Sequence, residues 1–108
     1  AKEAQIESHL SEDGRVRTYA AYGQLFFVTV TGFLDRFKYH EPVERVVIDL
    51  THAHIWDHSA VAALDKAVLN FRRNGVEVEV TGMNDATASL LNRLAIHDKP
   101  AAVKMAVS

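Results

Sequence analysis

Residues that can carry chemistry gather in one short stretch near the middle of the chain. His52, His54, Asp57, His58 and Ser59 bring imidazoles, a carboxylate and a hydroxyl together. These groups could serve a hydrolytic triad, a metal site, a phosphorylation switch or an ordinary helix cap. The segment "IWDHSAVAAL" follows a strand-like run and opens into an amphipathic pattern. The chemistry therefore depends on the elements that hold this segment.

Hydrolytic chemistry is disfavoured by the spacing. Asp57, His58 and Ser59 are adjacent, so their side chains would diverge around a helical turn, whereas a triad must converge. The sequence contains no G-x-S-x-G elbow and no glycine-rich phosphate loop. We therefore predict that the protein is not an enzyme.

A metal site is a second alternative. His52 and His54 are two residues apart, so on a strand they would share one face. Imidazoles with a carboxylate suit zinc, yet this spacing matches no specific zinc motif. We predict neither a metal nor a cofactor. A histidine-lined sensor that uses His52, His54 and His58 stays open as an alternative, and calorimetric titration with zinc would test it.

The turn from strand into helix is the strongest candidate site. Asp57 is a suitable N-cap for a helix that begins at His58, because a carboxylate accepts hydrogen bonds from free N–H groups there. The same helix start suits an anion or a phosphorylated side chain. Ser59 would lie at the carboxyl end of a central strand, where α/β folds often place ligands. The candidate turn is Asp57, His58, Ser59 and Ala60, either as a cap or as a phosphorylation, anion-binding or partner-binding turn.

Composition excludes several other function classes. The 108 residues suffice for one domain with one core, and the formal net charge of -2 gives no reason to expect nucleic acid as a partner. The absence of cysteine excludes disulfides and thiolate metal sites. No apolar run approaches the roughly 18 residues that span a bilayer. Because the chain lacks an initiator methionine, we expect it to be a piece of a longer protein.

The first half of the chain predicts strands and one short helix. Residues 1–14 carry few apolar positions and are expected to form a linker or short helix, which leaves 15–108 as the domain. Alternation predicts a strand over 15–23, and aromatic and β-branched residues predict a buried strand over 25–30. A tight hairpin connection would join these strands, and a short helix over 31–41 would follow.

The second half of the chain has clearer patterns. A nearly continuous apolar run predicts a central strand over 43–50, and helical spacing predicts a helix over 58–74. Strict alternation predicts a strand over 76–83, parallel to the central strand because such crossovers are right-handed. A last helix from Asn84 or Asp85 and a weak edge strand would complete the chain. We predict an α/β sandwich with a mixed sheet of four to five strands and helices mainly on one face.

The string "VVIDLTHAHIWDHSAVAALDKAVLNFRRNGVEVEVTGMN" strongly resembles a STAS domain, the fold shared by sulfate transporters and anti-sigma factor antagonists. The resemblance covers about residues 15–98. Its strongest parts are the turn from Asp57 to Ala60, the hydrophobic strand before it, and the helix, glycine and strand after it. The resemblance implies a small STAS-type sandwich.

Two branches of that family differ at the turn. Anti-sigma factor antagonists usually carry an Asp-Ser-Ser-Gly-like turn whose second serine is phosphorylated by the partner kinase. Here the turn reads Asp57, His58, Ser59 and Ala60, so Ser59 keeps the phosphorylatable position while its neighbours differ. The segment "YGQLFFVTV" resembles the Gly-x-Leu-Phe-Phe strand of SulP-type anion transporters. The resemblance therefore favours the transporter branch.

The resemblance implies a non-catalytic regulatory or assembly domain at the cytoplasmic face of the inner (plasma) membrane. It would belong to a SulP-type secondary transporter of sulfate, bicarbonate or dicarboxylate-type anions. Implied partners are the transmembrane domain of the same transporter and a second subunit, with a cytosolic regulatory protein or nucleotide as a further partner. Phosphate on Ser59 would add about two negative charges beside Asp57 and weaken an acidic or apolar contact. The alternative is a free-standing anti-sigma factor antagonist switched by phosphorylation of Ser59.

Overall fold

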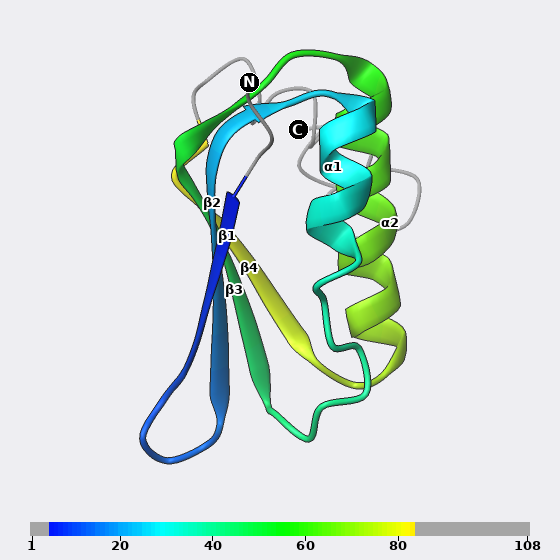
Figure 1. The fold of residues 1–108 in the computed structure, drawn as a ribbon. Coiled ribbons are helices and arrows are strands. Elements are labelled where there is room, and N and C mark those ends of the chain that lie inside the picture. Colours follow the sequence, from blue (N-terminus) through cyan, green and yellow to red (C-terminus); the bar gives the residue numbers. More distant parts are fainter. Residues whose placement is uncertain (1–4, 84–108) are drawn as a thin grey trace, which may run out of the picture.

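The protein forms a single mixed sheet with two helices packed on it (Figure 1). A computed structural model describes residues 5–83 of the chain. Its elements are β1 (Gln5–Leu10), β2 (Val16–Leu25), α1 (Phe27–Leu34), β3 (Arg45–Ile55), α2 (His58–Arg73) and β4 (Glu77–Thr81). The predicted α/β class and mixed four-stranded sheet are confirmed.

The strands lie in sequence order, and the two helices cover one face of the sheet (Figure 1). β1 pairs antiparallel with β2, whereas β2, β3 and β4 run parallel. Parallel neighbours need a crossover, and α1 and α2 supply the two crossovers. The predicted parallel pairing of β3 with β4 is confirmed, since Arg45 faces Glu77 and Asp49 faces Thr81.

The core lies between the sheet and the two helices. α2 turns the predicted face inward, and the sheet contributes alternate apolar residues of β3. The helix ends beside Gly75, whose φ of 81° is the left-handed conformation that favours glycine. The side chains on the inward face of α2 are Val61, Leu64, Val68 and Phe71.

The N-terminal segment is a strand where a linker or short helix was expected. β1 pairs with β2 from Gln5 opposite Tyr22 onward. Only Ile6 of this strand is partly buried, so the sequence carries no alternating apolar pattern to predict it. Backbone pairing holds the strand, and Asp13 closes the turn by accepting hydrogen bonds from the Ser11 hydroxyl (2.6 Å) and the Arg15 N–H (3.0 Å).

The strand expected over 25–30 is wrong, as is the hairpin before it. β2 runs on to Leu25, and α1 begins at Phe27. The Thr29 hydroxyl accepts a hydrogen bond from the Phe26 N–H (2.8 Å) and donates one to the Gln24 carbonyl (2.9 Å). These bonds turn the chain directly from strand into helix, so local structure overrides the strand propensity of the aromatic run.

Two predicted elements lie outside the described residues, namely the helix from Asn84 or Asp85 and the edge strand near the end of the chain. Within residues 5–83, no helix has the length and apolar character needed to cross a membrane.

Candidate functional site

The candidate turn lies where two parallel strands end together. Leu25 at the end of β2 is paired with Ile55 at the end of β3, and the Trp56 N–H donates a 3.0 Å hydrogen bond to the Leu25 carbonyl. Because both strands lead directly into helices, the N-termini of α1 and α2 lie close together at the carboxyl ends of the parallel strands (Figure 1). The sheet register therefore brings two separate segments of the chain into one site.

Asp57 joins the two helix starts. Its backbone is extended (φ -140°, ψ 161°), as an N-cap residue requires. One carboxylate oxygen, Oδ1, accepts a 2.7 Å hydrogen bond from the Ala60 N–H of α2. The other, Oδ2, accepts a 3.4 Å hydrogen bond from the Phe27 N–H of α1. The carboxylate thus lies near the positive ends of two helix dipoles, and the predicted N-cap role of Asp57 is confirmed.

The remaining residues of the turn divide into anchored and exposed groups. Ala60 is completely buried and fixes the first turn of α2 against the core. His58 and Ser59 are exposed at the helix start. Among the described residues, no hydrogen bond joins Asp57, His58 and Ser59 to one another. The turn therefore presents a free hydroxyl beside a capped helix start and lacks the geometry of a triad.

The histidines do not form a common cluster with Asp57. His52 stacks on Tyr22, with ring centroids 5.3 Å apart and an interplanar angle of 4°. His54 lies beside Trp56, with a centroid separation of 5.9 Å. Within the described part of the chain, no group of three or more metal-ligating side chains could hold an ion. The placement of these side chains gives no support to the three-histidine sensor.

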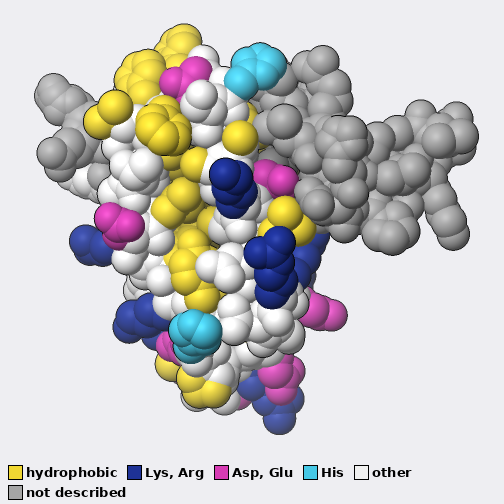
Figure 2. All heavy atoms as spheres, turned by 90° about the vertical axis from the view of Figure 1, so that its right-hand side faces the viewer, with side chains coloured by type: hydrophobic (Ala, Val, Ile, Leu, Met, Phe, Trp, Pro, Cys, Tyr) yellow, Lys and Arg dark blue, Asp and Glu magenta, His cyan; other side chains and the backbone are white. Residues whose placement is uncertain are grey.

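An aromatic patch beside the turn was missed by sequence reasoning. Phe26, Phe27, Val28 and Trp56, which we call the aromatic patch, are 45%, 51%, 78% and 60% exposed. Figure 2 shows hydrophobic side chains gathered at the upper end of the face that carries both helices, with a carboxylate and a histidine among them. The sequence predicts three of these residues to lie in a buried strand, because an aromatic and β-branched run is typical of one.

The patch is held in place by contacts on both sides. The Phe26 and Trp56 rings are stacked, with centroids 6.3 Å apart and an interplanar angle of 15°. The Trp56 indole N–H donates a hydrogen bond to the Gln24 side-chain oxygen. Phe26 has no side-chain acceptor for an N-cap, so the sequence carries no standard signal for this helix start, and the Thr29 hydroxyl accepts a hydrogen bond from the Phe26 N–H instead.

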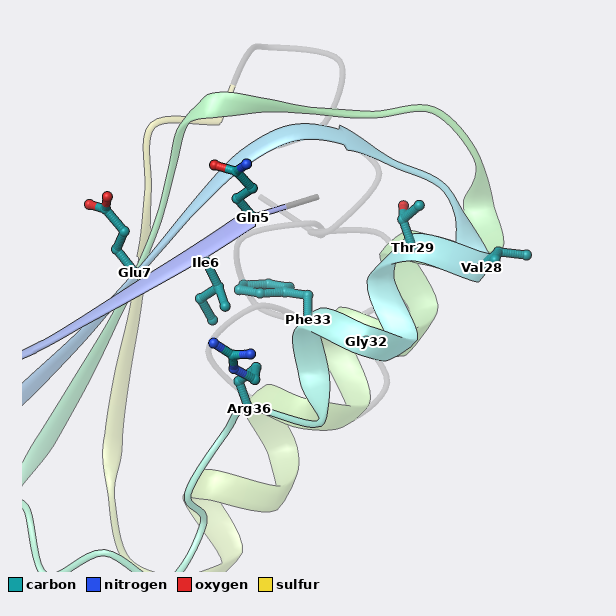
Figure 3. Close-up of a pocket in the computed structure, with 8 residues that line it drawn as sticks. All are labelled: Gln5, Ile6, Glu7, Val28, Thr29, Gly32, Phe33 and Arg36. Atoms are coloured by element: carbon teal, nitrogen blue, oxygen red, sulfur yellow. The ribbon is translucent and has the colours of Figure 1, made fainter. Parts of the chain in front are cut away.

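A groove of about 640 Å³ runs between β1 and α1 (Figure 3). Phe33 points from α1 toward the strand, and Ile6 points back from β1 toward it. Val28 contributes to the rim of this groove, while its side chain points away from β1 (Figure 3). The lining residues are Gln5, Ile6, Glu7, Val28, Thr29, Gly32, Phe33 and Arg36.

The fold and the site define a small α/β domain whose single mixed sheet is covered by helices on one face. A half-covered sheet presents an exposed hydroxyl at a capped helix start, next to an apolar surface. The STAS domain family model matches residues 8–108, and the chain belongs to this family. The predicted family is thereby confirmed.

Two relatives come from the two branches of the family. The chain is 50% identical over 91 residues to "Putative sulfate transporter YbaR" of Bacillus subtilis (strain 168). The match covers 84% of this chain and 19% of that protein, so the chain spans about a fifth of the relative's length. A solved structure of an antisigma-factor antagonist STAS domain from Rhodobacter sphaeroides is 52% identical, with a TM-score of 0.73. That match covers 78% of this chain and 91% of the other.

Proposed function

We propose that this chain is the non-catalytic regulatory and assembly domain of a SulP-type secondary anion transporter, at the cytoplasmic face of the inner membrane. The observation that carries the proposal is the 50% identity to a putative sulfate transporter about five times longer than the match. The transported anion would be of the sulfate, bicarbonate or dicarboxylate class. The partners would be the transmembrane domain of the same protein and a second subunit.

The geometry of the turn supports a role in docking. Ser59 is exposed and lies two residues after Asp57, whose carboxylate holds both helix starts. A phosphate, a nucleotide or a regulatory protein at this turn would change the charge of the turn and so alter docking.

Fractionation of the native organism tests the proposed function. An antibody raised against this domain should detect, in the membrane pellet, a band several times larger than 12.0 kDa. A band near 12.0 kDa that stays in the soluble fraction would contradict the transporter reading.

Substitution of Ser59 tests the regulatory turn within the transporter. Ser59→Asp adds a negative charge beside Asp57, and Ser59→Ala removes the hydroxyl. We expect the two variants to differ from each other in anion uptake or in subunit assembly, measured in vesicles and by native electrophoresis. The switch proposal fails if both variants match the unaltered protein.

A free-standing anti-sigma factor antagonist is the second candidate function. It is favoured by the 52% identity to an antisigma-factor antagonist domain of which this chain covers 91%. On this reading Ser59 would accept phosphate from a partner kinase. A soluble band near 12.0 kDa that shifts in phosphate-affinity electrophoresis, and no longer shifts after Ser59→Ala, would establish this alternative.

A further inference from the structure

We infer that the aromatic patch is the docking surface for one short apolar segment flanked by lysine or arginine, in a cytoplasmic loop of the membrane part of the same polypeptide. This inference rests on the proposed function and names the partner of its docking site. It assigns the apolar part of the contact to the patch residues Phe26, Phe27, Val28 and Trp56, which lie beside the turn. Exposure, rigidity, area and charge support it in turn.

The exposure of the patch is not required by the fold. Leu25 and Val30, on either side of Phe26, Phe27 and Val28, are completely buried and already anchor this segment to the core. Four large apolar side chains remain in water beside one another, at a free-energy cost that polar residues would avoid. Contiguous exposed apolar patches of this kind mark interaction sites on soluble domains.

The patch is also preorganised. Phe26 stacks on Trp56, and the Trp56 indole is hydrogen-bonded to Gln24. The Phe27 backbone is tied to Asp57 across 30 positions of sequence. Side chains that are already ordered lose less conformational entropy on binding. Such a surface suits a partner that is held by few contacts.

The area of the patch favours a tethered partner over a second copy of the chain. Three half-exposed aromatic rings and a valine offer on the order of 400 Å² of apolar surface. A stable interface between free proteins needs about 800 Å² from each partner. A partner in the same polypeptide has a high effective concentration, so a surface of this size is sufficient for it.

The charge around the patch selects the chemistry of the partner. The neighbouring side chains include Asp57, His54 and His58, and segments 24–29 and 54–60 contain no lysine or arginine. An anionic lipid surface attracts basic residues, so this patch is a poor match for the bilayer itself. Cytoplasmic loops of membrane proteins carry an excess of lysine and arginine next to apolar helix ends. The Asp57 carboxylate, the lack of basic side chains in these two segments and the apolar centre together complement such a loop.

Photo-crosslinking from the patch tests this inference in the full-length protein in its native membrane. Val28 is 78% exposed, so p-benzoylphenylalanine replaces it without disturbing the core. The matched control carries the same residue at Glu12, exposed in the hairpin at the opposite end of the sheet (Figure 1). Mass spectrometry then identifies the peptide joined to each position.

We expect position 28, and not position 12, to crosslink to an apolar peptide flanked by lysine or arginine in the same polypeptide. Val28→Asp should abolish cofractionation of a separately expressed domain with the rest of the transporter, while its circular dichroism stays unchanged. Crosslinks to lipid, to the same patch of a second copy, to a separate soluble protein, or equally from both positions would each overturn the inference. A membrane-sized band in fractionation would preserve the proposed function in all these cases, whereas a soluble band of about 12.0 kDa would overturn both.

Discussion

The Asp57 carboxylate accepts hydrogen bonds from two helices, which is more than an N-cap usually does. Ala60 belongs to the same helix as Asp57, whereas Phe27 begins a different one. The carboxylate therefore contacts both the helix start that carries Ser59 and the segment that carries the aromatic patch.

Replacing Asp57 should cost stability in a way that replacing Ser59 does not. Asp57→Ala removes an N-cap and should lower the free energy of unfolding by about 1–2 kcal/mol. Ser59→Ala changes an exposed hydroxyl and should stay within about 0.5 kcal/mol of the unaltered protein. Urea denaturation followed by circular dichroism measures both. Equal stability of the two variants would show that the carboxylate does not hold the helix starts.

At the scale of elements, the helices and strands that could be predicted are those whose burial leaves a regular pattern of apolar residues in the sequence. α2 was predicted because the sheet covers one face of the helix and leaves the other in water, which produces the helical spacing. The parallel strands β3 and β4 were predicted from the apolar run and the alternation in their sequences. β1 was missed because it is exposed on nearly all sides and relies on backbone pairing. α1 was displaced because its first residues read as a strand and its start depends on hydrogen bonds of Thr29.

The candidate site likewise has features that local sequence patterns predict and features that they do not. The capping role of Asp57 and the place of Ser59 at the helix start follow from local spacing, and both were predicted. The contact between Asp57 and Phe27 depends on the register of β2 with β3, which local patterns do not contain. The aromatic patch was missed because three of its residues follow β2 in a run typical of a buried strand, and the fourth, Trp56, joins them only through that register.

The start of α1 should be sensitive to the Thr29 hydroxyl. Thr29→Val keeps the shape of the side chain but removes the hydrogen bonds to the Phe26 N–H and the Gln24 carbonyl. We expect the free energy of unfolding to fall by about 1–2 kcal/mol. Thr31→Val in the same helix is the control, because its hydroxyl donates only to the Val28 carbonyl (2.8 Å) and should cost clearly less. A similar loss in both variants would show that Thr29 does not define the helix start.

At the scale of the whole molecule, an ion pair joins the sheet to the long connection before β3. Arg17 of β2 donates to Glu41 through Nε (3.0 Å) and through a terminal guanidinium nitrogen (2.6 Å). The two side chains are only 13% and 15% exposed, so water screens the pair less than a surface pair. Hydrogen bonding from Arg17 lowers the pKa of the Glu41 carboxyl below its ordinary value.

The lowered pKa of Glu41 predicts a loss of stability in acid. A carboxyl whose pKa is lower when folded stabilises the protein fully above its unfolded pKa, about 4.3 for glutamate. That contribution declines as the pH falls below this value and disappears below the folded pKa. Glu41→Gln should lower the free energy of unfolding by about 1–3 kcal/mol near pH 7, with a difference from the unaltered protein that shrinks in acid.

Denaturation at a series of pH values measures that difference. Glu12→Gln, in an exposed turn, is the matched control and should follow the unaltered protein throughout. A constant difference between Glu41→Gln and the unaltered protein down to the acid limit would contradict the assigned role of the ion pair.

The exposed indole of Trp56 has a consequence for spectroscopy. The chain contains one tryptophan, and that residue lies 60% exposed in the aromatic patch. Because the indole is already exposed to solvent in the folded state, its fluorescence should change little when the protein unfolds. Tryptophan fluorescence would therefore be a poor reporter of unfolding. The same exposure makes the indole accessible to iodide, and any partner that covers the patch should shift its emission to the blue and protect it from quenching. The protein therefore carries its own optical probe of docking, with no label required.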